Sequence, residues 1–154
     1  MEKITLKLGE ILQLESEING LENPETKEVI YHGFLKQNLP VILKYELKEL
    51  SEKLKKERET VDSIRVDLIK KYGEKSESGD VYVKMFDDVR DEEGNLIDRK
   101  YTQSYMDFDA EYSKLLNKEK EFVYNEITKE DLKEAGKTTD NYEILFKLIK
   151  KELN

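Results

Sequence analysis

The sequence contains no cysteine and no tryptophan, and only one histidine, seven glycines and two prolines. Without cysteine there are no disulfides and no thiolate metal sites, which is typical of a cytoplasmic protein. No apolar run approaches the roughly 20 residues that a membrane span needs. The N-terminal Met-Glu-Lys-Ile-Thr also lacks the charged-then-apolar order of a signal peptide. We therefore expect a cytoplasmic protein without a membrane partner.

Motifs for catalysis and cofactor binding are missing as well. His32 would have to serve any Ser-His-Asp or Cys-His arrangement, and no serine has a nucleophile-elbow context. The glycines are isolated, so neither a phosphate loop nor a dinucleotide fingerprint exists. Asp107, Asp109 and Glu111 would suit a Mg²⁺ or Ca²⁺ site on a loop, but not on a helix. Paired carboxylates for glycosidic chemistry stay open, since 35 acidic residues always offer some pair. We expect no enzyme, no cofactor and no metal.

Charge is abundant and mainly negative. Charged residues make up 40% of the chain and the formal net charge is −8. Residues 1–77 hold 14 basic against 16 acidic residues, and residues 78–154 hold 13 against 19. An acidic surface disfavours direct nucleic-acid binding. The acidity is explained either by solubility or by a surface that meets a basic partner.

The segment Pro40–Tyr72 organises the rest of the chain. Its apolar residues recur at alternating steps of four and three, which is the coiled-coil period. A helix of this length is on the order of 50 Å long and needs partners along most of its length. The sequence does not decide whether it packs within one chain or between chains. The apolar positions are Leu43, Leu47, Leu50, Leu54, Val61, Ile64 and Leu68.

A helical arm over residues 1–38 is predicted before this long helix. Ile4–Leu6 suits either a short strand or a helix entry, and a helical face follows from Leu8 until Gly20 closes it. The apolar residues between Val29 and Leu35 indicate a short helix that ends near Asn38.

A hairpin and shorter elements are predicted after the long helix. Alternation over residues 81–86 indicates a strand, residues 91–95 a turn, and residues 96–103 the returning strand. Asp107 is expected to cap a short helix that carries Phe108, Tyr112, Leu115 and Leu116. A strand over residues 121–127 precedes a helix from Thr128 to Gly136 and a last helix opened by Asp140. In that last helix Tyr142, Leu145, Phe146, Ile149 and Leu153 line one face.

These elements define an α+β fold, mostly α, in which a long central helix packs with helical arms and a small antiparallel β-hairpin. We expect one domain over residues 1–154. It divides into the helical arm 1–38, the long helix 40–72, the hairpin and short helix 81–117, and the strand and C-terminal helices 121–153.

Nine tyrosines supply the other notable feature, because several of them gather around the acidic hairpin. One interpretation is that they are buried in a small sheet; the other is an aromatic and acidic contact surface, the kind that carries interface energy. The candidate partner-binding residues of the second interpretation are Tyr82, Phe86, Asp87, Asp88, Asp91, Glu92, Tyr101 and Tyr105.

The order of features from Pro40 onward is also informative as a whole. Leu39-Pro40 opens the charged helix, and Leu68 to Glu74 ends it. A polar loop with Gly79-Asp80 follows, and Phe108 lies on a later short helix. Glu121 to Ile127 then runs into Thr128-Lys-Glu-Asp-Leu132 and a terminal helix.

In this order the chain resembles a loose group of small, uncharacterised proteins encoded by phages and prophages of Gram-positive bacteria. The resemblance implies a context, the cytoplasm of a bacterial host, rather than an activity, since small acidic phage proteins without catalytic motifs usually bind another protein. Three hypotheses follow. The first is a non-catalytic protein that binds and modulates a host or phage protein with a basic surface, in its specific version an inhibitor of a defence system. The second is a virion or tail assembly protein that oligomerises through the long helix, and the third is a protein that sequesters a small ligand or nucleotide.

Overall fold

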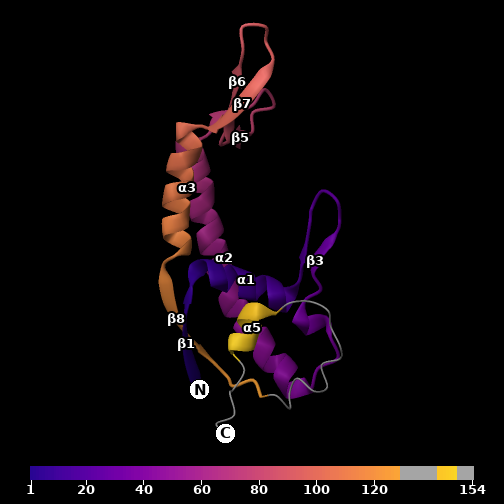
Figure 1. Cartoon of the computed structure of the whole chain (residues 1–154). Coiled ribbons are helices and arrows are strands. Elements are labelled where there is room, and N and C mark those ends of the chain that lie inside the picture. The colour runs from indigo at the N-terminus through magenta and orange to yellow at the C-terminus, as the bar shows by residue number, and fades with distance from the viewer. Residues whose placement is uncertain (129–141, 149–154) are drawn as a thin grey trace. The chain divides into compact units, whose positions relative to one another are not determined.

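The structure is a computed structural model that describes residues 1–128 and 142–148 (Figure 1). Its contacts divide the chain into two compact units, Met1–Glu59 with Lys118–Asn154 (unit 1) and Thr60–Asn117 (unit 2). The predicted α+β class, with a long helix and small antiparallel sheets, is confirmed. The expectation of one domain over residues 1–154 stays a prediction.

Unit 1 is built around the first half of α2 (Val41–Tyr72), a helix of 32 residues that begins one residue after the predicted start at Pro40 and ends at Tyr72 as expected. Its apolar positions pack within the unit together with α1 (Leu8–Asn19), so this part of the helix finds its partners in the same chain. Gly20 ends α1 with a φ of 93°, which favours glycine. The buried side chains here are Leu43, Leu47, Leu50 and Leu54 of α2, and Ile11, Leu14 and Ile18 of α1.

The sheet of unit 1 joins the N-terminus to a distant strand. β1 (Glu2–Lys7) pairs antiparallel with β8 (Glu119–Tyr124), from Glu2 opposite Tyr124 to Lys7 opposite Glu119. Leu6 and Phe122 point into the core. The strand predicted over residues 121–127 is therefore confirmed with earlier bounds, and Ile4–Leu6 belongs to a strand.

The short helix predicted between Val29 and Asn38 is wrong. The structure has a small hairpin there, β2 (Leu21–Glu22) with β3 (Val29–Tyr31), and then a 3-10 turn, η1 (Phe34–Lys36). The reason is a turn upstream, where Asn23 Oδ1 accepts the N–H groups of Glu25 and Thr26 at 2.9 and 3.3 Å. This turn sends the chain back beside Leu21 and commits Val29–Tyr31 to strand pairing.

Unit 2 contains the end of α2 and the helix α3 (Gln103–Leu116), which lie side by side (Figure 1). In sequence, four strands connect these two helices and form two antiparallel pairs. The strands are β4 (Glu74–Lys75), β5 (Val81–Tyr82), β6 (Phe86–Arg90) and β7 (Leu96–Tyr101). Within residues 60–117, all of which are described, Val61 and Thr102 are the buried side chains. The unit therefore has almost no core of its own.

Three details of unit 2 differ from the sequence-based expectation. The strand predicted over residues 81–86 is divided between β5 and β6. The N-cap of α3 is Thr102 and not Asp107, because Thr102 Oγ1 accepts the N–H of Tyr105 at 3.0 Å. Ile64 of the apolar seam is 37% exposed and not packed as the seam predicts.

The C-terminal part that the structure describes is a short helix of unit 1, α5 (Glu143–Lys147). Tyr142, Ile144, Leu145 and Leu148 are buried, whereas Phe146 is 52% exposed. The expected position of Phe146 on the packed face is thus wrong, because a helix of five residues buries only one narrow side. The helix predicted from Thr128 to Gly136, and Ile149 and Leu153, lie outside the described residues. Among those described, no helix combines the length and apolarity needed to cross a bilayer.

Candidate protein-interaction surface

A stack of three aromatic rings stands at the base of the β6–β7 hairpin. The rings of Phe86 and Tyr101 have centroids 4.9 Å apart at 26°, and those of Tyr101 and Tyr105 are 5.2 Å apart at 18°. Tyr101, in the middle, is 54% exposed. A stacked set of rings in contact with water is an unusual use of such side chains, which normally supply core or interface energy.

The stack is assembled by two neighbouring elements. Phe86 and Tyr101 are directly opposite one another in the β6–β7 register, so their side chains share one face of the hairpin. Tyr105 comes from the first turn of α3, whose start is fixed by Thr102. The Thr102 N–H donates to Met85 O at 3.0 Å and its hydroxyl donates to Lys84 O, so this residue ties the helix to the strand.

Apart from Asp98, whose Oδ1 accepts the backbone N–H of Arg99 at 2.8 Å, the acidic residues of the hairpin fall into two groups. The first group is engaged within the unit: Asp88 pairs with Arg99 at 3.0 Å and Arg90 at 3.6 Å, and Asp87 with Lys84 at 3.2 Å. The hydrogen bond from Lys84 to the Asp87 carboxylate raises the pKa of this lysine. These two predicted contact residues are therefore part of the hairpin's own charge network.

Asp91 also serves the hairpin internally. Its Oδ1 accepts the backbone N–H of Glu93 at 3.0 Å and of Asn95 at 2.8 Å, and Gly94 takes a φ of 86° in the same turn. This confirms the turn predicted over residues 91–95. Asp91 shapes the tip of the hairpin.

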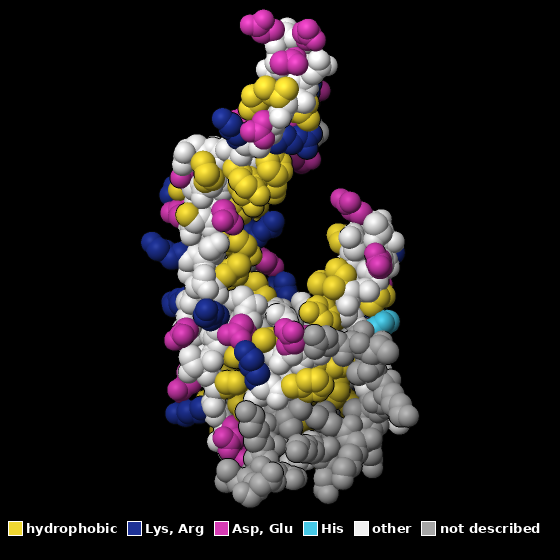
Figure 2. Space-filling view, viewed as in Figure 1, with side chains coloured by type: hydrophobic (Ala, Val, Ile, Leu, Met, Phe, Trp, Pro, Cys, Tyr) yellow, Lys and Arg dark blue, Asp and Glu magenta, His cyan; other side chains and the backbone are white. Residues whose placement is uncertain are grey.

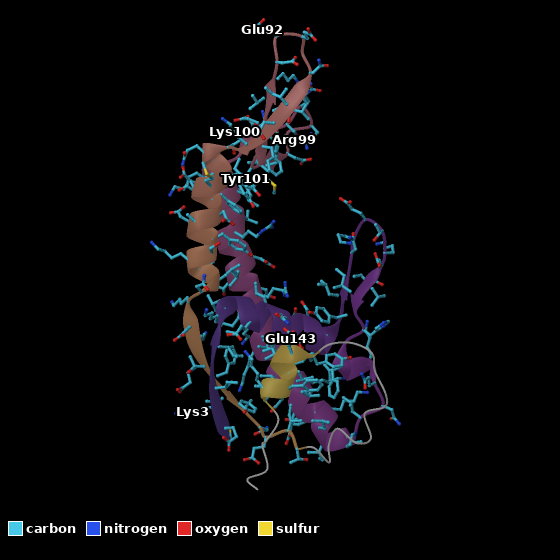
Figure 3. All side chains as sticks on the ribbon, viewed as in Figure 1. Lys3, Glu92, Arg99, Lys100, Tyr101 and Glu143 are labelled. Carbon is cyan, nitrogen blue, oxygen red and sulfur yellow. The ribbon has the colours of Figure 1, made fainter. Side chains whose placement is uncertain are left out.

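The second group is Glu92 with its neighbour Glu93. Among the described residues, neither carboxylate forms an ion pair or a side-chain hydrogen bond. Figure 3 shows Glu92 at the turn and Tyr101 at the opposite end of the hairpin. Figure 2 shows acidic side chains at this turn and hydrophobic side chains along the hairpin below it.

Tyr82 is placed apart from the stack. It lies on β5, and its hydroxyl donates to Glu74 Oε1 at 3.1 Å. The bond to a carboxylate stabilises the protonated phenol and raises the pKa of Tyr82. The structure thus brings together Phe86, Tyr101 and Tyr105, but not Tyr82.

Sequence reasoning missed three residues of this surface. Met85, Leu96 and Ile97 are 43%, 47% and 63% exposed, next to or within the hairpin. Leu96 and Ile97 are adjacent in β7, where a shift of register opposite Val89 and Arg90 interrupts the strict alternation of the hairpin. The signal available was the Leu96-Ile97 pair itself, two adjacent apolar residues directly after a turn.

Other chemistry has little support in the described residues. They contain no group of three or more His, Cys, Asp or Glu side chains placed to hold a metal ion. Asp107, Asp109 and Glu111 lie on the helix α3, so the alternating loop geometry that a metal site would use is not formed. Asp107 instead accepts from Gln103 Nε2 at 2.9 Å, and Glu111 pairs with Lys71 at 3.4 Å.

An open groove in unit 2 lies near the hairpin and is lined by Tyr72, Gly73, Glu74, Lys84, Asp87, Thr102, Gln103 and Ser104. Its lining contains one basic side chain, Lys84, and two acidic ones, Glu74 and Asp87, so its charge does not favour an anion. Comparison of the chain with protein-family models, with curated proteins and with solved structures finds no match.

Proposed function

We propose that the chain is a non-catalytic interaction protein, of the kind that phages encode, which binds a host or phage protein through the β6–β7 hairpin and modulates its activity. The specific version is inhibition of a host defence factor. Phe86, Tyr101 and Tyr105 form the apolar part of the contact, and Glu92 and Glu93 form its acidic part. The exposed aromatic stack is the observation that carries this proposal.

The energetics of interfaces favour this reading of the stack. Tyrosine supplies a large, rigid contact area and is enriched among the residues that dominate binding energy. Tyr101 can be covered by a partner without any rearrangement of the hairpin, because Phe86 and Tyr105 hold its ring in place. A pre-formed contact of this kind loses little conformational entropy on binding.

The charge of unit 2 supports a partner with a basic surface. Residues 60–117 contain 14 acidic and 9 basic residues, a net charge of −5. Asp87 and Asp88 are already paired within the hairpin, and Asp91 and Asp98 accept backbone N–H groups there. Glu92 and Glu93 are therefore the hairpin carboxylates that remain to meet a partner. Complementary charge steers association and selects among partners more than it raises affinity.

The alternative functions have weaker support. Assembly through the long helix would use its apolar seam, but Leu43, Leu47, Leu50 and Leu54 are buried within unit 1. Only Ile64 and Leu68 near the end of α2 remain for such a contact. Sequestration of a nucleotide would need a basic pocket, and the groove beside the hairpin carries Glu74 and Asp87 against Lys84.

Site-specific photocrosslinking tests the proposal. We would replace Ile97 by p-benzoylphenylalanine, irradiate the chain in extracts of the cells that encode it, and identify crosslinked proteins by mass spectrometry. The matched control carries the same group at Ile30, which is 52% exposed on the β2–β3 hairpin of unit 1. We expect one protein that crosslinks from position 97 and not from position 30. Equal crosslinking from both positions, or none from position 97, would contradict the proposal.

A further inference from the structure

A carboxylate is buried where α1 meets the C-terminal helix of unit 1. The side chain of Glu17 on α1 has no exposed surface, and its Oε1 accepts the backbone N–H of Ile144 at 3.1 Å. Ile144 lies in the first turn of α5, whose N–H groups have no partner within the helix. Among the described residues, the other oxygen, Oε2, has no hydrogen-bond partner although it is buried.

Two further polar contacts hold this segment besides the one to Glu17. Lys147 Nζ lies 2.6 Å from Glu10 Oε2 at the surface, and the Tyr142 hydroxyl accepts from Gln37 Nε2 at 3.1 Å. The rings of Phe34 and Tyr142 meet edge to face at 5.4 Å. Glu17 is thus the one fully buried carboxylate among the described residues.

We propose that Glu17 is a protonation-controlled latch for the segment Tyr142–Leu148. When the Glu17 carboxyl is neutral, the segment stays docked on α1. When it is ionised, a charge lies in an apolar interface with only part of its hydrogen bonds formed, and the segment is released. Release uncovers the apolar side chains Ile144, Leu145 and Leu148, together with the α1 surface that they cover.

The electrostatics of the interface agree with this geometry. Burial raises the pKa of Glu17 to about 7, against 4.5 for an ordinary glutamate. The Ile144 and Leu145 N–H groups act in the opposite direction. Of the charged groups that face it from α5, Glu143 raises this pKa and Lys147 lowers it. The neighbouring η1 (Phe34–Lys36) carries one charged side chain, Lys36.

The sign of the effect follows from linkage. A pKa that is higher in the docked state means that docking takes up a proton, so docking is strongest in acid. Docking weakens as the pH rises from 4.5 to 7 and changes little above that range. With the docked pKa near 7 and a released pKa of 4.5, the docking equilibrium constant falls about tenfold between pH 6 and pH 8.

Amide hydrogen exchange of the full chain measures this equilibrium directly. Protection factors at Ile144 and Leu145 remove the intrinsic pH dependence of exchange, and we expect them to fall about tenfold between pH 6 and pH 8. In Glu17→Gln, which cannot ionise, they should not change over this range. In the matched control Glu10→Gln, which removes the surface ion pair between the same two helices, the fall should persist.

A pH dependence that survives in Glu17→Gln, or protection factors that are constant in the unchanged chain, would overturn the latch. A second measurement needs no substitution: the side-chain carboxyl ¹³C shift of Glu17 and the amide shift of Ile144 should titrate together near pH 7. A Glu17 midpoint near 4.5 would overturn the proposal even if the variant does not fold.

Discussion

Arg58 joins the two helices that form most of the core of unit 1. Its Nε lies 2.7 Å from Glu15 Oε2, and its Nη2 donates to Leu12 O at 2.7 Å and to Ser16 Oγ at 2.9 Å. The guanidinium therefore satisfies a carboxylate, a backbone carbonyl and a hydroxyl of α1 at once. A planar, multiply bonded group of this kind stabilises more than a single exposed ion pair does.

Replacing Arg58 by Lys should lower the free energy of unfolding by about 1–2 kcal/mol, because a lysine cannot reach all three acceptors. The expected loss of stability is moderate because the Arg58–Glu15 ion pair is partly exposed to solvent. The matched control is Arg65→Lys, at an exposed position of the same helix, which should change stability by less than about 0.5 kcal/mol. Urea unfolding of both variants checks this, and equal losses would show that the contacts of Arg58 add nothing.

The buried Glu17 makes overall stability depend on pH. Because its pKa is raised to about 7 in the folded chain, its contribution is fully present below pH 4.5 and is lost as the pH rises to 7. The loss amounts to about 3 kcal/mol when complete. Urea midpoints should therefore fall between pH 5 and pH 8, and Glu17→Gln should flatten this fall. A midpoint of the variant that falls as steeply as that of the unchanged chain would count against the assignment.

At the scale of elements, Thr102 is the residue on which unit 2 depends most. It caps α3 through the N–H of Tyr105 and bonds the backbone of Met85 and Lys84 at the start of the hairpin. In a unit with almost no buried apolar side chains, such polar links define how the helix and hairpin join. The aromatic stack depends on the same link, because Tyr105 is in the turn that Thr102 caps.

Thr102→Ala should remove the cap and the bond to Lys84, at a cost of about 1–2 kcal/mol. We expect faster amide exchange at Tyr105 and new ring shifts for Tyr101, both measured by NMR. Thr102→Ser keeps the hydroxyl and is the control; it should retain most of the protection at Tyr105. If the alanine and serine variants behave alike, the hydroxyl is not what joins helix and hairpin.

Elements that follow from a long periodic pattern or from the chemistry of a few neighbouring residues could be predicted from the sequence. Pairings between strands that are far apart in the sequence could not. The long helix follows from the regular apolar spacing between Leu43 and Leu68, and the turn at Asp91 and Gly94 from local chemistry. The sequence predicts a helix at Val29–Tyr31 because a short apolar run fits a helix or a strand equally well. Pairing with Leu21 makes this segment a strand. The pairing of Glu2 with Tyr124 joins opposite ends of the chain, which no local pattern contains.

At the scale of the whole molecule, the two units use their apolar residues differently. Unit 1 encloses a core of leucine and isoleucine side chains, although Ile30 and Ile42 are exposed. Unit 2 has almost no core and leaves Phe86, Ile97 and Tyr101 in contact with water. A small hairpin gains little stability from such exposed side chains. Exposed apolar residues around an acidic turn are better explained by recognition of another protein.

Part of this surface could be predicted, since alternation across the turn places Phe86 opposite Tyr101. The internal roles of Asp87, Asp88 and Asp91 could not, because they depend on which lysine and arginine side chains the folded hairpin brings within reach. The prediction that all eight residues contact a partner stays a prediction, and Glu92 with the aromatic stack is its strongest part.

The dissociation constant of the crosslinked partner tests the central claim most directly. It would be measured for the unchanged chain, for Glu92→Lys with Glu93→Lys, and for a matched control, Glu25→Lys with Glu28→Lys on the exposed β2–β3 turn of unit 1. We predict that charge reversal at the β6–β7 turn weakens binding at least about tenfold, mostly by slowing association at low salt. The control variant should bind as tightly as the unchanged chain. Equal affinities for the two double variants would contradict recognition through this hairpin.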